Sequence, residues 1–231
     1  MIKTPARALV VTPHPDDAEF GCAGTVARWV REGCEVAYVL CTDGGKGTAN
    51  PEVTPQALAE TREREQRAAC AVLGVKEVVC LGYPDGELEE SRQFLREIVR
   101  QIRRFRPEVV FCPEFFRKGS WHRDHRVTGR VVVDACFPYA RDYLHFPELW
   151  KEEGLAPHKV ATVLMWGSEE PDTFLDITDT IEQKVQALLA HASQIEPHWR
   201  AGERIREWAR GHGEKAGVQY AEAFRRIDFR T

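Results

Sequence analysis

The sequence predicts an α/β protein in which helices cover both faces of a mostly parallel sheet. Short apolar runs rich in β-branched residues alternate with longer segments of helical period, and four such units occur in the first 135 residues. Because crossovers between parallel strands are right-handed and connections are short, this alternation leaves few topologies. The chain has 231 residues, 43% of them hydrophobic, which is enough to bury a substantial core. We therefore expect a single domain over residues 1–231.

The expected strands are five apolar runs, and a helical segment follows each of the first three. The runs lie at residues 8–11, 35–41, 77–82, 108–113 and 159–165. Apolar residues recur with helical spacing at 21–31, 56–73 and 92–105. In a sheet built this way, ligands bind outside the carboxyl ends of the strands.

The last third of the chain departs from this alternation. Residues 138–157 contain three prolines among aromatic residues and predict an irregular excursion, suited to a flap or an oligomer contact. Two or three helices are expected after 174–180, with Asp179 or Thr180 as the N-cap of a helix over 181–194. Helical period then continues over residues 203–227.

The charge balance limits the kinds of partner. A formal net charge of -4 argues against a nucleic-acid or anionic-membrane partner, because both normally require a basic surface. The first residues lack the features of a secretion signal, and no window approaches 18 consecutive apolar residues. The sequence thus predicts a cytoplasmic protein with a small-molecule ligand.

The stretch TPHPDDAEFGC, at residues 12–22, places two adjacent carboxylates directly after the first expected strand. Asp16 and Asp17 repel each other, so their position beside a hydrophobic strand costs stability unless a cation, a proton or water neutralises them. His14 lies just before them. A metal ion is the obvious candidate for the neutralising group.

A second cluster, in the stretch GSWHRDHRVTG, follows the strand at 108–113. His122 and His125 are three residues apart, so a helix beginning here would put both rings on one face, with Asp124 between them to orient a ring. Since parallel strands end at the same edge of a sheet, the two clusters should meet there. Two histidines and one aspartate could hold a divalent ion and leave a position open for water, as a catalytic zinc requires. The spacing does not decide which aspartate is the ligand, and two solvated acidic turns are the alternative.

The stretches PHPDDAEFGCAGT and WHRDH together resemble the LmbE/PIG-L family of zinc-dependent de-N-acetylases. TREREQRAACAVLGV, LGYPDGEL, DIT, AHASQ and YAEAF follow in the order found in that family. The resemblance implies a Rossmann-like three-layer αβα sandwich that hydrolyses an acetamide on an amino sugar. It also implies one Zn2+ per chain, with Fe2+ or another divalent ion as alternatives. Similar small bacterial members deacetylate N-acetylglucosaminyl-malate in bacillithiol synthesis.

The resemblance also assigns roles to the residues of the two clusters. It implies that the metal ligands are His14, Asp17 and His125. Asp16 would be the general base, taking a proton from water and passing it to the leaving amine. His122 would be an electrophilic helper that donates to the oxyanion. In this scheme the ion acidifies the water and polarises the amide carbonyl.

Asp124 is expected either to hold His122 protonated or to orient His125. The substrate contacts implied by the resemblance are Arg62, Asp85 and Thr42. Two of these also have ordinary explanations, because Arg62 could be one charge on a helix face and Asp85 part of a β-turn.

Three other functions compete with this interpretation. A nucleotide-binding Rossmann domain needs a glycine-rich turn after the first strand, where this chain has PHPDD. A non-catalytic sugar-binding protein of the same fold would not need Asp16 and His122. An amidase acting on mercapturate-type thiol conjugates remains an alternative. The resemblance further implies a homo-oligomer, a trimer or a hexamer, in which residues 138–157 could supply contacts.

Overall fold

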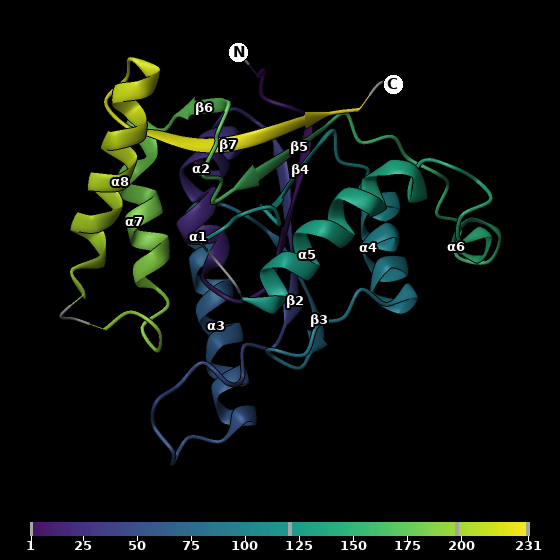
Figure 1. Cartoon of the computed structure of the whole chain (residues 1–231), viewed down its shortest axis with the longest axis horizontal. Coiled ribbons are helices and arrows are strands. Elements are labelled where there is room, and N and C mark those ends of the chain that lie inside the picture. Colours follow the sequence, from purple (N-terminus) through teal and green to yellow (C-terminus); the bar gives the residue numbers. More distant parts are fainter. Residues whose placement is uncertain (1, 120–121, 197–198, 230–231) are drawn as a thin grey trace.

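The fold is a seven-stranded mixed sheet within the described residues, with helices on both faces (Figure 1). The structure is a computed structural model that describes residues 2–119, 122–196 and 199–229. The strand order is β3-β2-β1-β4-β5-β7-β6. The first five strands in this order pair in parallel. The predicted mostly parallel α/β fold is confirmed. One sheet contains strands from both ends of the chain, which supports the single domain predicted over 1–231; that boundary stays a prediction.

The five expected strands are all present. They are β1 (Arg7–Thr12), β2 (Glu35–Thr42), β3 (Glu77–Tyr83), β4 (Val109–Pro113) and β5 (Thr162–Trp166). Strand β1 is buried along both faces, as its unbroken apolar run requires in the middle of a parallel sheet. Its side chains alternate, so Leu9 packs in one apolar cluster and Val10 in the other.

Two strands at one edge of the sheet were not predicted. They are β6 (Thr173–Asp176) and β7 (Ala221–Asp228). Strand β7 lies between β5 and β6 and pairs antiparallel with both. The prediction of helical period over 203–227 is therefore wrong for its last part. The helix ends at Ala216, where Gly217 adopts a left-handed φ of 72°, and the following residues complete the edge of β5.

The helices form two layers around the sheet. Their bounds are α1 (Asp17–Gly21), α2 (Ala23–Arg31), α3 (Pro55–Leu73), α4 (Arg92–Phe105), α5 (Arg123–Asp134), α6 (Pro147–Lys151), α7 (Ile181–Leu189) and α8 (Ala201–Ala216). Helices α2, α3 and α7 share an apolar cluster with one face of the sheet, while α4 and α5 pack on the other. Figure 1 shows α7 and α8 on the opposite side of the sheet from α4 and α5.

The helix ends partly follow the predicted signals. The helix predicted over 21–31 corresponds to α2, which begins at Ala23, and the short helix α1 before it was not predicted. Thr180 is the N-cap residue of α7, as predicted, but its side chain makes no capping bond. Its hydroxyl donates instead to the carbonyl of Gly24 at 2.8 Å, which joins α7 to α2. Helix α7 ends at Leu189, before the end of the predicted 181–194 segment.

The segment 138–157 is irregular apart from a short π-helical turn (Ala135–Tyr139) at its start and α6, as predicted. It is fixed to α4 by Arg103, whose buried guanidinium donates to five of its backbone carbonyl groups. Three large apolar side chains of the segment are exposed: Tyr143, Leu144 and Trp150. No helix in the described ranges is long and apolar enough to cross a membrane.

Helix α5 lies very close to the end of β4, and this contact positions the second histidine cluster. A Cβ added at Gly129 would lie 2.3 Å from the carbonyl oxygen of Pro113. We expect Gly129→Ala to lower the free energy of unfolding by about 1–3 kcal/mol through overpacking, measured by urea denaturation. Gly211→Ala in α8 is the control, because a Cβ there meets nothing within 4 Å. An equal free energy of unfolding for Gly129→Ala and Gly211→Ala would contradict the close contact between α5 and the carbonyl of Pro113.

Candidate metal centre

His14 is buried between three carboxylates at the carboxyl edge of the sheet. Its Nδ1 lies 3.0 Å from Oδ2 of Asp17, and its Nε2 lies 3.1 Å from Oδ1 of Asp85 and 3.0 Å from Oδ2 of Asp124. The three carboxylates come from the start of α1, from the loop after β3 and from the first turn of α5. The ends of separate strands therefore converge on one imidazole, as the parallel sheet predicts.

Asp17 connects the two predicted clusters. One of its oxygens faces His14, and the other lies 3.2 Å from Nε2 of His125. The three residues predicted as metal ligands are thus brought together. Ring nitrogens of His14, His122 and His125 also lie within 4.8 Å of one another, so His122 is a further potential ligand. The exact ligand set stays a prediction.

The chemistry of these donors fits a divalent ion. Imidazole nitrogen and carboxylate oxygen are ligands of zinc and of other first-row metals. The carboxylates of Asp17, Asp85 and Asp124 contact His14, and such a concentration of negative charge requires a cation. The bond between Nε2 of His14 and Asp124 fixes the ring so that Nδ1 faces Asp17 and His125. The donors of His14, Asp17 and His125 could hold the ion, and this set stays a prediction.

The carboxylate of Asp124 has other partners than the two that were predicted, and its role stays a prediction. Its carboxylate bonds to His14 and accepts the backbone N–H groups of Gly86 at 2.7 Å and Leu88 at 3.1 Å. In the described contacts it touches neither predicted partner, because the first turn of α5 directs it inward toward β1. Its backbone N–H instead donates to Nδ1 of His122 at 3.3 Å. That bond leaves the proton of a neutral His122 ring on Nε2.

The charges at the site shift several pKa values. Burial by itself would lower the pKa of His14, but its bonds to Asp124, Asp17 and Asp85 raise it to about 11. The bond to His14 lowers the pKa of Asp85 to about 2. Burial opposes ionisation of Asp17, yet His125 and His14 hold its pKa well below the usual range. Without an ion, a protonated His14 therefore carries the positive charge that the carboxylates need.

This arrangement predicts how the stability of the metal-free protein depends on pH. The pKa of His14 is 6.5 when unperturbed and about 11 in the fold, so its stabilising contribution is complete below pH 6.5 and is lost as the pH rises toward 11. We expect the Tm measured in chelator to fall between about pH 6.5 and 8.5. Added metal should restore more stability at the higher pH, because the ion displaces that proton.

His14→Gln is the control for this pH dependence, since it removes the titrating ring. The variant should show a flatter dependence of Tm on pH over the same range. A wild-type Tm that rises or stays constant in chelator from pH 6.5 to 8.5 would contradict a protonated His14.

Asp16, the predicted base, is held by helix α3. It has a φ of 100° and precedes the first residue of α1. Arg62 donates to its Oδ2 at 3.2 Å and to the carbonyls of Pro15 and Gly44 at 2.5 and 2.9 Å. Burial and the neighbouring Asp17 raise the pKa of Asp16 to about 7, although Arg62 acts in the opposite direction. A carboxyl group with this pKa can accept and release protons near neutral pH.

Behind Asp16 lies a buried polar chain that the sequence analysis did not identify as a unit. Gln66 accepts the backbone N–H of Asp16 at 3.3 Å and donates to Glu19 at 3.0 Å. The other oxygen of Glu19 lies 3.1 Å from Nε2 of His191, and both side chains are fully buried. The spacing of Arg62 and Gln66, four residues apart on the inner face of α3, is the sequence signal that could have indicated this support.

The three predicted substrate contacts are buried and bonded within the protein. Arg62 bonds to the carboxylate of Asp16, and Asp85 bonds to the ring of His14. The hydroxyl of Thr42 donates to the carbonyl of Pro13 at 2.8 Å. They do not line the large cavity beside the site. Their contacts show that they position the loop of Asp16, and contact with substrate stays a prediction for all three.

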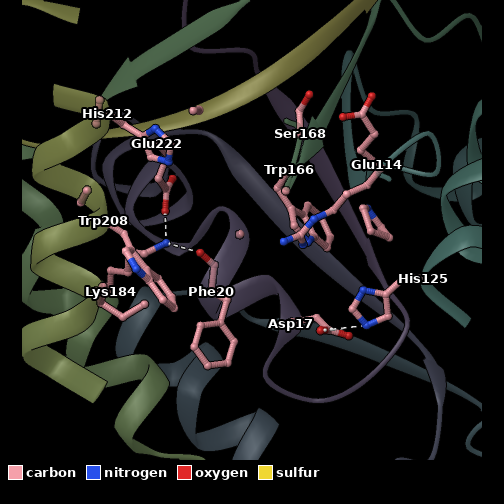
Figure 2. A pocket seen from close by; sticks show the side chains of 18 of the residues that line it. Asp17, Phe20, Glu114, His125, Trp166, Ser168, Lys184, Trp208, His212 and Glu222 are labelled. Atoms are coloured by element: carbon pink, nitrogen blue, oxygen red, sulfur yellow. Dashed lines mark hydrogen bonds and ion pairs between the residues drawn. The ribbon is translucent and has the colours of Figure 1, made fainter. Parts of the chain in front are cut away.

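A cavity of about 560 Å³ opens beside Asp17 and His125. Its walls come from the start of α1, the loops after β4 and β5, and helices α7 and α8 with strand β7. Figure 2 shows His125 on one side of the cavity, with Trp208 and Lys184 on the other and Trp166 between them. A volume in the range of about 300–1,000 Å³ is typical of small-molecule sites.

These features define an α/β protein with a candidate divalent-metal centre and an adjoining ligand cavity at the carboxyl edge of its sheet. The chain belongs to the GlcNAc-PI de-N-acetylase (PIG-L) family, whose sequence model matches residues 9–136. The resemblance stated from the motifs is thereby confirmed. Homologues include de-N-acetylases of N-acetylglucosamine-type substrates.

Three relatives and one solved structure illustrate the range of the family. The chain is 34% identical to the diacetylchitobiose deacetylase of Thermococcus kodakarensis, over 95% of this chain and 82% of that protein. It is 29% identical to a probable N-acetyl-alpha-D-glucosaminyl L-malate deacetylase 2 of Bacillus anthracis, over 84% of each. It is also 29% identical to the mycothiol S-conjugate amidase of Streptomyces coelicolor, over 82% of this chain and 83% of that one. The structure of N,N'-diacetylchitobiose deacetylase from Pyrococcus horikoshii has a TM-score of 0.91 and 31% identity, covering 97% and 84% of the two chains.

Proposed function

We propose that this protein is a zinc-dependent hydrolase that removes the N-acetyl group from an N-acetylglucosamine-type conjugate and releases acetate. The observation that carries the proposal is the position of Asp16. This carboxyl group, with its pKa raised to about 7, adjoins the donor set of His14, Asp17 and His125. A base beside a divalent-metal site is what hydrolysis of an unreactive amide needs.

The residues of the site divide the work as follows. When bound, the ion acidifies a water molecule and polarises the amide carbonyl. Asp16 accepts the proton of the attacking water and later donates it to the leaving amine. Arg62 and Gln66 hold Asp16 in place through its carboxylate and its backbone N–H. The Nε2–H group of His122 donates a hydrogen bond to the developing oxyanion and keeps its proton, while Nδ1 accepts the backbone N–H of Asp124.

This scheme revises the expectation that His122 acts in its protonated form. Burial, together with His14 and His125, lowers the pKa of His122, so its neutral ring is favoured. We expect His122→Ala to lower kcat by about 10²–10³, the usual effect of one oxyanion donor. Any fall of kcat/KM at high pH should occur at the same pH as in the wild type, because a His122 ring that is already neutral loses no proton there. Bound metal should equal that of the wild type. A loss of metal in this variant would make His122 a ligand instead of a helper.

Acetate release is the direct test of the proposed function. Metal-loaded protein is incubated with diacetylchitobiose, N-acetylglucosaminyl-malate and N-acetylglucosaminyl-inositol, and acetate is measured. Protein treated with chelator and the Asp16→Asn variant are the controls. Acetate from at least one conjugate supports the proposal, and the malate conjugate tests the link to bacillithiol synthesis. Binding of these sugars without acetate release would indicate a non-catalytic sugar-binding protein.

An amidase acting on thiol conjugates is the second candidate, favoured by the similarity to the mycothiol S-conjugate amidase. The same donor set and base would hydrolyse either amide. A mercapturate-type conjugate in the same assay distinguishes the two. Faster cleavage of this amide than of any acetamide would replace the first proposal.

Two further features are part of the proposal. Zinc as the ion, one per chain, is tested by elemental analysis of protein purified without added metal. A trimer or hexamer is tested by sedimentation, and the exposed side chains of Tyr143, Leu144 and Trp150 would supply contacts. Cytoplasmic location stays a prediction from the sequence.

A further inference from the structure

The end of the cavity away from His125 is formed by aromatic side chains. Phe20 and Trp199 meet edge to face with ring centres 5.5 Å apart, and Trp199 and Trp208 lie 6.3 Å apart. We call these three residues the aromatic wall. Trp208, on α8, is 48% exposed, so a large part of its indole is available to a ligand. Figure 2 shows Trp208 and Phe20 across the cavity from His125.

The aromatic wall is held in place from one side by Arg204. Its guanidinium lies 5.4 Å from the ring centre of Trp199 and 6.0 Å from that of Trp208, within range of cation–π contact. Arg204 is not one of the residues that line the cavity. This contact favours one orientation of the two indoles before a ligand arrives, which lowers the entropy cost of binding.

The buried cation at this end of the cavity is already neutralised. Nζ of Lys184 lies 2.5 Å from Oε1 of Glu222 and donates to the carbonyl of Phe20 at 2.7 Å (Figure 2). The other oxygen of Glu222 accepts the backbone N–H and the hydroxyl of Thr25 at 2.8 and 2.6 Å. Lys184 is thus engaged in a complete network and is not available to pair with an anionic ligand.

The acidic group on the opposite wall is also paired. Glu114, which is buried, accepts a bond from Arg225 at 3.1 Å. Arg117 lines the cavity as well, but its side chain is exposed to solvent. A dicarboxylate such as malate would need charged partners in the interior of the site. The buried charged groups Lys184 and Glu114 are therefore already paired within the protein, so an uncharged ligand needs no counterion from them.

The remaining lining groups suit the hydroxyls of such a ligand. Ser168 and His212 bring polar atoms to the cavity, and Nδ1 of His212 is a buried atom without a hydrogen-bond partner in the described part of the chain. A sugar ring has C–H faces that stack on indoles and a rim of hydroxyls that form hydrogen bonds. It matches an aromatic surface combined with neutral polar groups better than a purely apolar or a charged ligand does.

We infer that the aromatic wall is a binding subsite for a second, uncharged sugar ring attached to the N-acetylglucosamine unit that is hydrolysed. This inference rests on the proposed function, because it places the acetamide near Asp17 and His125 and the rest of the substrate toward Trp208. The wall lies mostly in residues 199–208, beyond the 9–136 segment that the family model matches. Substrate choice would therefore be set by the C-terminal part of the chain.

The test compares two substrates in the Trp208→Ala variant. For wild type and variant, kcat/KM is measured on diacetylchitobiose and on N-acetylglucosamine, and the ratio of the two values is calculated. We expect the ratio to fall about tenfold in Trp208→Ala, mainly through KM, and to be largely restored in Trp208→Phe. Leu189→Ala is the control, since Leu189 is a partly exposed apolar side chain at the end of α7 that does not line the cavity. Its ratio should equal that of the wild type.

Other results have distinct meanings. An equal loss on both substrates in Trp208→Ala, or an unchanged ratio, would overturn the inference while leaving the deacetylase activity intact. A wild-type preference for N-acetylglucosaminyl-malate over diacetylchitobiose would also overturn it. No acetate from any substrate would instead remove the proposed function. Direct binding of diacetylchitobiose to the Asp16→Asn variant, measured by calorimetry with and without Trp208→Ala, tests the subsite without turnover.

Discussion

Asp16→Asn is expected to lower kcat by about 10²–10⁴ while the protein keeps its metal. The magnitude is that of losing a general base and acid placed in the reaction path. Asparagine has nearly the shape of aspartate and still offers an oxygen to Arg62, which donates to Oδ2 of Asp16 at 3.2 Å. The loop should therefore stay in place. Only the ability to exchange a proton is lost.

The neighbouring variant Asp17→Asn is the comparison that gives this result its meaning. Asp17 lies against both His14 and His125, so its substitution should remove metal first and activity as a consequence. Kinetics and elemental analysis on the same preparations distinguish the two defects. Equal metal loss in both variants would show that the roles of the two carboxylates have been assigned incorrectly.

His125→Ala is expected to abolish hydrolysis by removing the metal, with activity falling to the level of chelator-treated wild type. The side chain of His125 is 24% exposed and its described ion pair is to Asp17, so the fold should survive the change. Circular dichroism and Tm check the fold, and elemental analysis checks the ion. Stoichiometric metal in a folded His125→Ala protein would contradict the assignment of His125 as a ligand.

His14→Ala should give the same loss of metal together with a loss of stability. The three carboxylates around His14 would be left without a cation, and breaking a buried ionic contact costs about 3–5 kcal/mol. Both variants should lose the metal, but only His14→Ala should also lose stability. This difference distinguishes His125 at the open side of the site from His14 at its buried centre.

The central strands could be predicted because each is buried on both faces and has an unbroken apolar run. Strand β7 could not be predicted in this way. Ala221, Phe224 and Ile227 recur at every third position, which matches the spacing of a helix and not the alternation of a strand. Residues 221–228 form a strand because they pair with the free edge of β5, about 60 positions earlier in the chain. The sequence around residues 221–228 contains no information about that partner. Strand β6 has four residues, too few for a reliable pattern.

The site shows the same division between local and distant information. His14 and Asp17 are three residues apart, so a short motif was enough to indicate them together. The partner of Asp124 is His14, 110 positions away, and only the folded sheet brings the two together. Asp85 reaches the same ring from the loop after β3. Sequence spacing identified the residues that gather at the site but not which of them touch.

The position of β7 between β5 and β6 has a consequence for biosynthesis. During translation β5 leaves the ribosome long before β7, so its outer edge stays unpaired until residues 221–228 emerge. Glu222 arrives in the same strand, and until then the buried Lys184 lacks its counterion. A chain arrested at the end of α8 would thus expose a sheet edge able to pair with other chains, and it would lack a wall of the ligand cavity. Pairing of β7 with β5 therefore both covers this edge of the sheet and completes the cavity.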